Sequence, residues 1–445
     1  MGAAESQDAL SRAKSRQRRI GLTSVASFIS RIAGFLTSFA TIPFTLHYLG
    51  TERFGLWMTV NSVLAMLAFA DLGIGNGLLN IVAKANGDSD RATMRAAISS
   101  AYVVLTLIAV VLLALMMVAI PAVDWRTFFN LQTPLAAREA PNALRVFALC
   151  FALNIPFGVV TRVQLALQLG FINGIWQICG ALGGLAGIAL AIYFDGGLPW
   201  LVAAVAGMPV LFSSLGTVVF FLKIAPDLRP TLSAASLSTM NRLVRVGMLF
   251  FALQLTASLA YSADNTIASR LLGAKEVADY SIAVRLFSVS SVVLGMVLQP
   301  LWPAFTEAIA RRDLGWVRIT LRRMVISAAV VTTVGSCCFL WGFDFITDIW
   351  LHRRLHVTLA TLLGLGFWSV TEAVGMSLAM FLNAAHVVRF QLILAALFAV
   401  TCIAVKILAV KSFGVQGMPW ATLSTYLPIV LLPTLLRLPR LMRSL

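Results

Sequence analysis

The sequence predicts an all-α polytopic membrane protein with about twelve transmembrane helices in two parallel-repeat lobes of six helices each. Of its 445 residues, 59% are hydrophobic and only 12% are charged, whereas about a quarter of the residues of soluble domains are charged. Among the long stretches that contain no charged residue, four show this clearly, and each can cross a hydrocarbon core of about 30 Å as a helix. These stretches are 96–123, 163–194, 196–222 and 412–436. The polar gaps are short, so we expect no soluble domain.

Hydropathy divides the chain into spans that are separated by short polar segments. The spans cover residues 20–48, 54–83, 96–121, 142–168, 171–194, 198–222, 243–270, 277–306, 324–343, 357–384, 390–411 and 416–437. We therefore expect a basic tail at 1–19, an N-terminal lobe at 20–222, a linker at 223–242, a C-terminal lobe at 243–437 and a second tail at 438–445. The first apolar stretch is too long for a signal peptide and ends in no small-residue cleavage site, so we expect a retained span.

Basic residues are distributed unevenly between the two sides of the predicted membrane. With the N-terminus inside, the inner segments hold 22 of the 34 lysines and arginines and the outer segments hold 10, Lys406 and Lys411 among them. Only Arg31 and Arg285 remain in mid-span. The excess of basic residues inside predicts that both termini are cytoplasmic. Topology and contact with anionic membrane lipids explain the net charge of +16, so we expect no nucleic-acid partner.

The two halves carry a weak internal repeat. A shift of 223 residues places Leu272-Gly273 on Leu49-Gly50 and Tyr280 on Trp57. The pattern of span, Leu-Gly hairpin, span and basic loop therefore recurs after an even number of spans. Parallel repeats of this kind build two lobes with a central site between them.

Two arginines lie deep within spans, one in each predicted lobe. At 1.5 Å per residue, Arg31 lies roughly 15 to 18 Å from the start of the first span. An arginine at that depth costs at least about 2.5 to 3.5 kcal/mol on insertion scales, so it should face the bundle interior or a wet cavity. Arg285, in the eighth span, is the deep arginine of the C-terminal lobe.

Several motifs resemble one family of transporters. They are Ser30-Arg31-Ile32-Ala33-Gly34-Phe35, Leu49-Gly50, Phe54 to Trp57, Asp71 to Gly73, Tyr280 to Leu286 and Gln299 to Pro303. With them the chain is similar to polysaccharide transporters of the O-antigen flippase type, in the superfamily that also contains multidrug extruders and lipid II flippases. Lipid II flippases carry two further C-terminal spans that this sequence lacks, so a peptidoglycan precursor is the less expected cargo.

The resemblance implies a V-shaped, two-lobed fold like that of MATE multidrug transporters. It also implies export of undecaprenyl-pyrophosphate-linked oligosaccharides, for O-antigen, capsule or exopolysaccharide, by alternating access. The cargo would move from the cytoplasmic to the periplasmic leaflet of a bacterial inner membrane. A polysaccharide polymerase and the chain-length machinery are the protein partners that the resemblance implies.

A pyrophosphate head suits the deep arginines, because a guanidinium offers a planar fork of donors that matches phosphate oxygens. We therefore expect Arg31 and Arg285 to bind the head. The alternative is that each arginine pairs with a buried acid, for example Arg31 with Asp71, and holds helices in register. Arg53 could extend the cationic path, although snorkelling to the headgroups is the favoured explanation of an arginine at a span end.

Amides in the spans are further candidates for contacts with the cargo. Asn154 and Gln164 could donate hydrogen bonds to sugar hydroxyls, or could link neighbouring helices at about 1 kcal/mol each. The sequence does not separate these two roles.

Three acids lie in mid-span, namely Asp71, Asp264 and Glu372. Carboxylates at membrane depth often belong to ion sites or proton relays, so these are candidates for coupling to Na⁺ or H⁺. We expect no other cofactor and no metal, because His352 and His356 flank two arginines in a short loop. We also expect no enzymatic activity, since the chain has no GxxxxGK[ST] phosphate loop and no set of nucleophile, base and orienting residue.

Two other functions stay open at this stage. A multidrug or organic-cation antiporter of the same superfamily would need a cavity rich in acids and aromatic residues; the deep arginines argue against it, whereas the mid-span acids favour it. A non-transporting scaffold of a polysaccharide synthesis complex is the third.

Overall fold

The computed structural model describes residues 21–34, 37, 45, 47–50, 53–54, 56–57, 71–128, 131, 133–272, 274–351 and 357–444. Within these ranges, the side chains at 128, 257–279, 281, 350–351 and 444 are not described. Every regular element in the described ranges is a helix. The chain divides into two compact units, residues 1–248 and 249–445.

The N-terminal unit begins with a helix over residues 21–34. It continues through α2 (Ile74–Gly87), α3 (Arg91–Ala122), α4 (Trp125–Phe128), α5 (Pro134–Ala166), α6 (Gly170–Tyr193), α7 (Gly197–Val202), η2 (Ala203–Gly207), α8 (Met208–Val219), η3 (Phe220–Ile224), η4 (Pro226–Leu228) and η5 (Leu232–Ala234). Nearly all of α2 is buried, and it packs against α3 and α5. The polar side chains on α2 and on the facing part of α5 therefore lie inside this unit.

Local sequence sets the starts of two long helices in this unit. The Asp90 carboxylate accepts a hydrogen bond from the backbone N–H of Thr93 and caps α3. Thr133 caps α5, and Pro134 occupies its first turn, where no backbone N–H is needed. The cap explains why α5 begins eight residues before the span predicted at 142–168.

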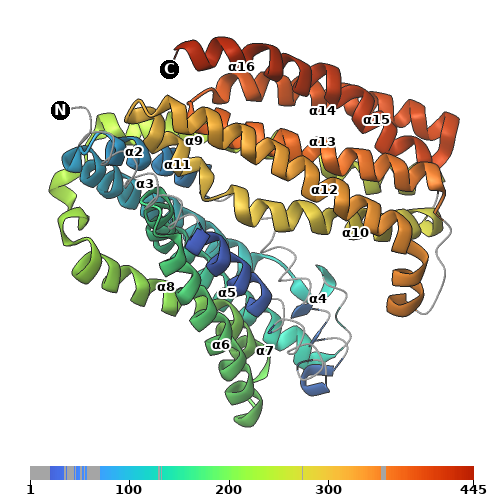
Figure 1. Cartoon of the computed structure of the whole chain (residues 1–445). Helices are drawn as coiled ribbons and strands as arrows, with labels where there is room; N and C mark the ends of the chain where they lie inside the picture. Colours follow the sequence, from blue (N-terminus) through green and yellow to red (C-terminus); the bar gives the residue numbers. More distant parts are fainter. Residues whose placement is uncertain are drawn as a thin grey trace, which may run out of the picture. The chain divides into compact units, whose positions relative to one another are not determined.

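Helix α9 (Leu237–Leu272) leads into the C-terminal unit. That unit contains α10 (Ala274–Leu298), α11 (Leu301–Ala310), α12 (Leu314–Leu351), α13 (Leu359–Ala384), α14 (Val388–Phe413), η6 (Gly414–Gln416), α15 (Gly417–Tyr426), η7 (Leu427–Leu431) and α16 (Leu432–Ser444). Helix α13 is its centre and packs against α10, α11, α12 and α15 (Figure 1). Side chains of α13 can therefore meet groups from several neighbours.

Eight helical segments in the described part of the chain are long and apolar enough to cross a membrane. Their outward side chains are apolar, as at Val118, Trp341 and Val400, which are exposed by 72%, 99% and 73%. Large apolar groups in such positions need lipid around them. The chain is thus a multi-pass membrane protein, and parts of the first two predicted spans lie outside the described residues.

Two predicted spans are interrupted. The span predicted at 277–306 is two helices, because α10 ends at Leu298 and α11 starts after Pro300, which has no N–H to donate. The span predicted at 54–83 contains a turn at 71–73, so α2 starts only at Ile74. Hydropathy averages over such breaks and therefore misses them.

Candidate functional site

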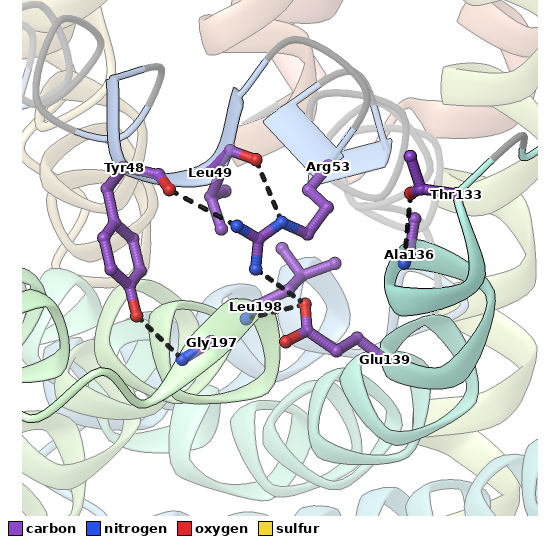
Figure 2. Close-up of polar contacts among 8 residues, drawn as sticks. All are labelled: Tyr48, Leu49, Arg53, Thr133, Ala136, Glu139, Gly197 and Leu198. Atoms are coloured by element: carbon purple, nitrogen blue, oxygen red, sulfur yellow. Dashed lines mark hydrogen bonds and ion pairs between the residues drawn. The ribbon is translucent and has the colours of Figure 1, made fainter.

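Arg53, a predicted contact of the cargo, is held by hydrogen bonds within the N-terminal unit. Its Nη1 lies 3.4 Å from Oε2 of Glu139 at the start of α5. Its Nε donates to the carbonyl of Leu49 at 2.9 Å, and its Nη2 donates to the carbonyl of Tyr48 at 3.4 Å. Figure 2 shows the guanidinium between the backbone of Tyr48 and Leu49 on one side and Glu139 of α5 on the other. Three of its nitrogens are therefore already engaged.

The same cluster also fixes the start of α7. The backbone N–H of Leu198 donates to Oε2 of Glu139 at 3.3 Å, and that of Gly197 donates to the Tyr48 hydroxyl at 3.1 Å (Figure 2). Tyr48 and Arg53 are thus joined to α5 and α7 through one carboxylate and one phenol. This arrangement is typical of contacts that stabilise the fold.

Asp71, a predicted ion-coupling residue, has a cationic partner in the same unit. Its Oδ2 lies 3.9 Å from Nη2 of Arg162 on α5, and its Oδ1 accepts the N–H of Gly73 at 2.9 Å. Among the described residues its ion-pair partner is therefore Arg162, and the alternative pairing with Arg31 is not made. A methyl group at Gly75 would lie 2.7 Å from Asp71 Oδ2 and 2.9 Å from Arg162 Nε. Because Gly75 has no side chain, Asp71 and Arg162 have the space to approach each other.

The other predicted cargo contacts have varied surroundings. Arg31 is exposed near the end of the described helix 21–34, Arg285 is exposed near the middle of α10, and Asn154 is exposed on α5. Gln164 is 1% exposed, and neither its amide nitrogen nor its amide oxygen has a hydrogen-bond partner within the described residues. Arg31, Arg285 and Asn154 can therefore be reached from outside their own unit, whereas Gln164 cannot.

Glu372 lies in the middle of α13, at the heart of the C-terminal unit. Its Oε2 accepts a hydrogen bond of 2.6 Å from the hydroxyl of Ser291 on α10. One turn further along α13, a methyl group at Gly375 would collide with the Tyr426 hydroxyl. Glu372 therefore lies where α10, α13 and α15 come together. Asp264, the third predicted acid, lies outside the described side chains.

Two cavities in this unit adjoin Glu372. The first, which we call the Asn383 cavity, has a volume of about 360 Å³ and includes Asn383, Gln391, Tyr426 and Thr434 in its wall. The second, the Lys406 cavity, has a volume of about 200 Å³. Its polar wall residues are Tyr280, Ser288, Ser369, Lys406 and Thr422. Glu372 is the one described residue that borders both cavities.

Lys406 is a deep cation that the hydropathy pattern did not identify. It was assigned to an outer segment, but it is 1% exposed on α14, which continues to Phe413. Seven residues of helix place it about 10 Å before the end of α14. The apolar residues on both sides of Lys406 could have indicated its depth, because they allow the helix to continue past the lysine.

Comparisons with known proteins agree with the helical architecture. The model of a family described as polysaccharide biosynthesis protein matches residues 18–309. A protein of Yersinia pseudotuberculosis named for O-antigen export is 20% identical over 365 residues, covering 81% of this chain and 82% of that protein. A Salmonella typhi protein named as an O-antigen transporter is 23% identical over 297 residues, covering 64% and 65% respectively.

Solved structures show the same fold. A MATE transporter in its bent conformation is 16% identical over 96% of this chain and 97% of its own, with a TM-score of 0.81. A multidrug resistance MATE transporter of the MOP superfamily, facing outward, has the same identity and coverage, with a TM-score of 0.79. A MOP superfamily transporter from Pyrococcus furiosus, 16% identical over 96% of both chains, has a TM-score of 0.78. The fold is therefore polytopic and MATE-like.

Proposed function

Since the chain belongs to the polysaccharide biosynthesis protein family, we propose that it exports oligosaccharides linked to undecaprenyl pyrophosphate. Its relatives named for O-antigen export and transport support a polysaccharide cargo. The proposed direction is from the cytoplasmic to the periplasmic leaflet of a bacterial inner membrane, with both termini cytoplasmic. A polysaccharide polymerase and the chain-length machinery would receive the product.

The observation that carries this proposal is the environment of Arg31 and Arg285. Both are exposed, and neither forms an ion pair within the described part of the chain. A cation in the middle of an apolar span is costly unless it serves an anionic partner. The pyrophosphate of the cargo is such a partner, and bidentate contacts with its oxygens suit a guanidinium.

The structure narrows the other proposed cargo contacts. Asn154 is exposed and can meet sugar hydroxyls. Arg53 is bound to Glu139, and Gln164 is buried, so we assign both to the structure of the N-terminal unit.

The experiment is to follow the lipid-linked sugar pool in cells that depend on this protein. After depletion, we expect undecaprenyl-pyrophosphate oligosaccharide to accumulate where a periplasm-restricted enzyme cannot reach it. Arg31→Gln and Arg285→Gln should each slow clearance of this pool about tenfold, since each removes charge-assisted hydrogen bonds of about 1.5 kcal/mol or more. Arg318→Gln, which removes an exposed arginine near the start of α12, is the matched control and should change nothing.

The opposite result would favour the second candidate function. An unchanged sugar pool, together with new sensitivity of the depleted cells to cationic dyes, would indicate a multidrug antiporter. The MATE fold alone is compatible with that activity.

A further inference from the structure

We propose that Glu372 carries protons along a path through the C-terminal unit, between the Asn383 cavity and the Lys406 cavity, and that Lys406 makes this path select protons over sodium ions. The proposal rests on the proposed transport function, because a coupling ion requires a cargo. It names the coupling ion and one residue, Lys406, that decides which ion is used.

The two cavities lie on opposite sides of Glu372 along α13. The Lys406 cavity begins at Leu365 and the Asn383 cavity ends at Asn383, and both include Glu372. A helix rises 1.5 Å per residue, so the 18 residues between Leu365 and Asn383 span about 27 Å. The hydrocarbon core is about 30 Å thick. The cavities together therefore extend along most of a membrane crossing, with one carboxylate between them.

Both cavities are suited to hold water. A buried water needs about 10 to 15 Å³ and two to four polar partners, and both cavities are much larger. The Asn383 cavity presents an amide pair, since Gln391 donates to Asn383 at 2.9 Å. The Lys406 cavity presents the hydroxyls of Ser288, Ser369 and Thr422. Water in both cavities would connect Glu372 to the two ends of α13.

The charges around Glu372 decide between a proton and a sodium ion. The titratable groups that face the cavities from packed helices are Tyr280 on α10, Lys406 on α14 and Tyr426 on α15. In the described residues, α11 and α12 contribute nothing to either wall. A sodium ion bound at Glu372 would add a second cation beside the ammonium group of Lys406. A proton instead neutralises the carboxylate and leaves one positive charge in the Lys406 cavity.

The transfer needs no further reactant. A hydronium ion in one cavity loses a proton as one of its O–H bonds breaks, leaving water, and an O–H bond forms on the Glu372 carboxylate, which becomes a neutral acid. That O–H bond then breaks toward water in the other cavity, and the carboxylate again accepts the hydroxyl of Ser291. One proton enters, one leaves and no electron is transferred.

The test uses the purified full-length protein and measures its thermal unfolding midpoint between pH 5 and 9, with 100 mM NaCl or 100 mM KCl. For the natural sequence we expect a midpoint that changes with pH and is the same in both salts. Glu372→Gln should remove part of the pH dependence. Lys406→Met should make the midpoint rise in NaCl relative to KCl. Lys411→Met, at an exposed position on the same helix, is the matched control and should behave like the natural sequence.

Two results would overturn the proposal. One is a sodium-specific stabilisation of the natural sequence that Glu372→Gln removes, which would identify a sodium site. The other is a pH dependence that Glu372→Gln leaves intact. If Lys406→Met does not fold, Lys406→Gln and the charge-retaining Lys406→Arg provide the comparison, and only Lys406→Gln should respond to sodium.

The lipid-linked sugar pool separates this proposal from the proposed function. If cells with the natural sequence clear the pool, and cells with Glu372→Gln clear it equally fast, only the proton path fails. If the natural sequence has no effect on the pool, the transport function itself fails.

Discussion

Ionisable groups have different surroundings in the two units. In the N-terminal unit, Arg53 contacts Glu139 and Arg162 contacts Asp71, and these pairs join parts of the chain that are far apart in sequence. In the C-terminal unit, Glu372 accepts a hydrogen bond from a serine and borders two cavities, one of which also contains Lys406. The first arrangement fixes helix ends, whereas the second leaves room for water around the charges.

This difference shows which acids at membrane depth are the better candidates for ion coupling. Asp71 and Glu372 looked alike in the sequence, because each is a single carboxylate within an apolar span. A carboxylate that is paired with an arginine and accepts a backbone N–H, as Asp71 does, is held by contacts within its unit. A carboxylate with one hydroxyl partner and adjacent cavities gives up a single hydrogen bond, that from Ser291, when it takes a proton. Removing the N-terminal pairs should therefore mainly change stability, whereas changes at Glu372 should mainly change ion dependence.

The largest stability effect is expected at Glu139. Glu139→Ala leaves Arg53 without its carboxylate and the N–H of Leu198 without its acceptor, at a side chain that is only 16% exposed. We expect a loss of about 2 to 3 kcal/mol, below the full value for a buried pair because both partners retain some solvent contact. Chemical or thermal unfolding of the purified protein measures this loss.

A double variant shows whether the pair itself is responsible. In Arg53→Met/Glu139→Ala no uncompensated cation remains, so the double variant should be more stable than Glu139→Ala alone. Equal stability of the two variants would mean that the cluster in Figure 2 is not held by this ion pair.

A smaller effect is expected at Gly75. Gly75→Ala would push a methyl group against Asp71 and Arg162, and overpacking of this kind costs about 1 to 2 kcal/mol. Gly158→Ala is the control, because a methyl group at Gly158 meets nothing within 4 Å and alanine favours a helix. A loss at Gly158 equal to that at Gly75 would show that the Asp71–Arg162 pair does not need this space.

Much of the fold could be predicted from the sequence. The length of an apolar stretch and the basic residues beside it are properties of neighbouring residues, so they do not depend on tertiary contacts. The rule that a charge in an apolar span is costly proposed Glu372, Arg31 and Arg285 as site residues, and their roles stay predictions. The sequence did not predict that Asp71 pairs with Arg162, because the two residues are 91 positions apart and only tertiary packing brings them together. Lys406 was misplaced because hydropathy locates the ends of a span only to within a few residues.

The smallest effect concerns Asp90, an exposed cap in the N-terminal unit. Hydrogen bonds from the hydroxyl and the backbone N–H of Thr93 lower the pKa of Asp90. A lowered pKa means that the cap contributes its stabilisation above the ordinary value of about 3.9 and loses it as the pH falls through the lower value of the folded state. The first turn of α3 should therefore open more readily only in strong acid.

Hydrogen exchange at the start of α3, compared between the natural sequence and Asp90→Asn at each pH, measures this opening. Asparagine also caps helices but does not titrate in this range, so the ratio of exchange rates should change below about pH 4 and stay constant from pH 5 to 9. A constant ratio in acid would rule out titration of the Asp90 cap as the cause of opening. A ratio that changed near neutral pH would show that another group of the N-terminal unit affects the start of α3, and the contrast between the two units would weaken.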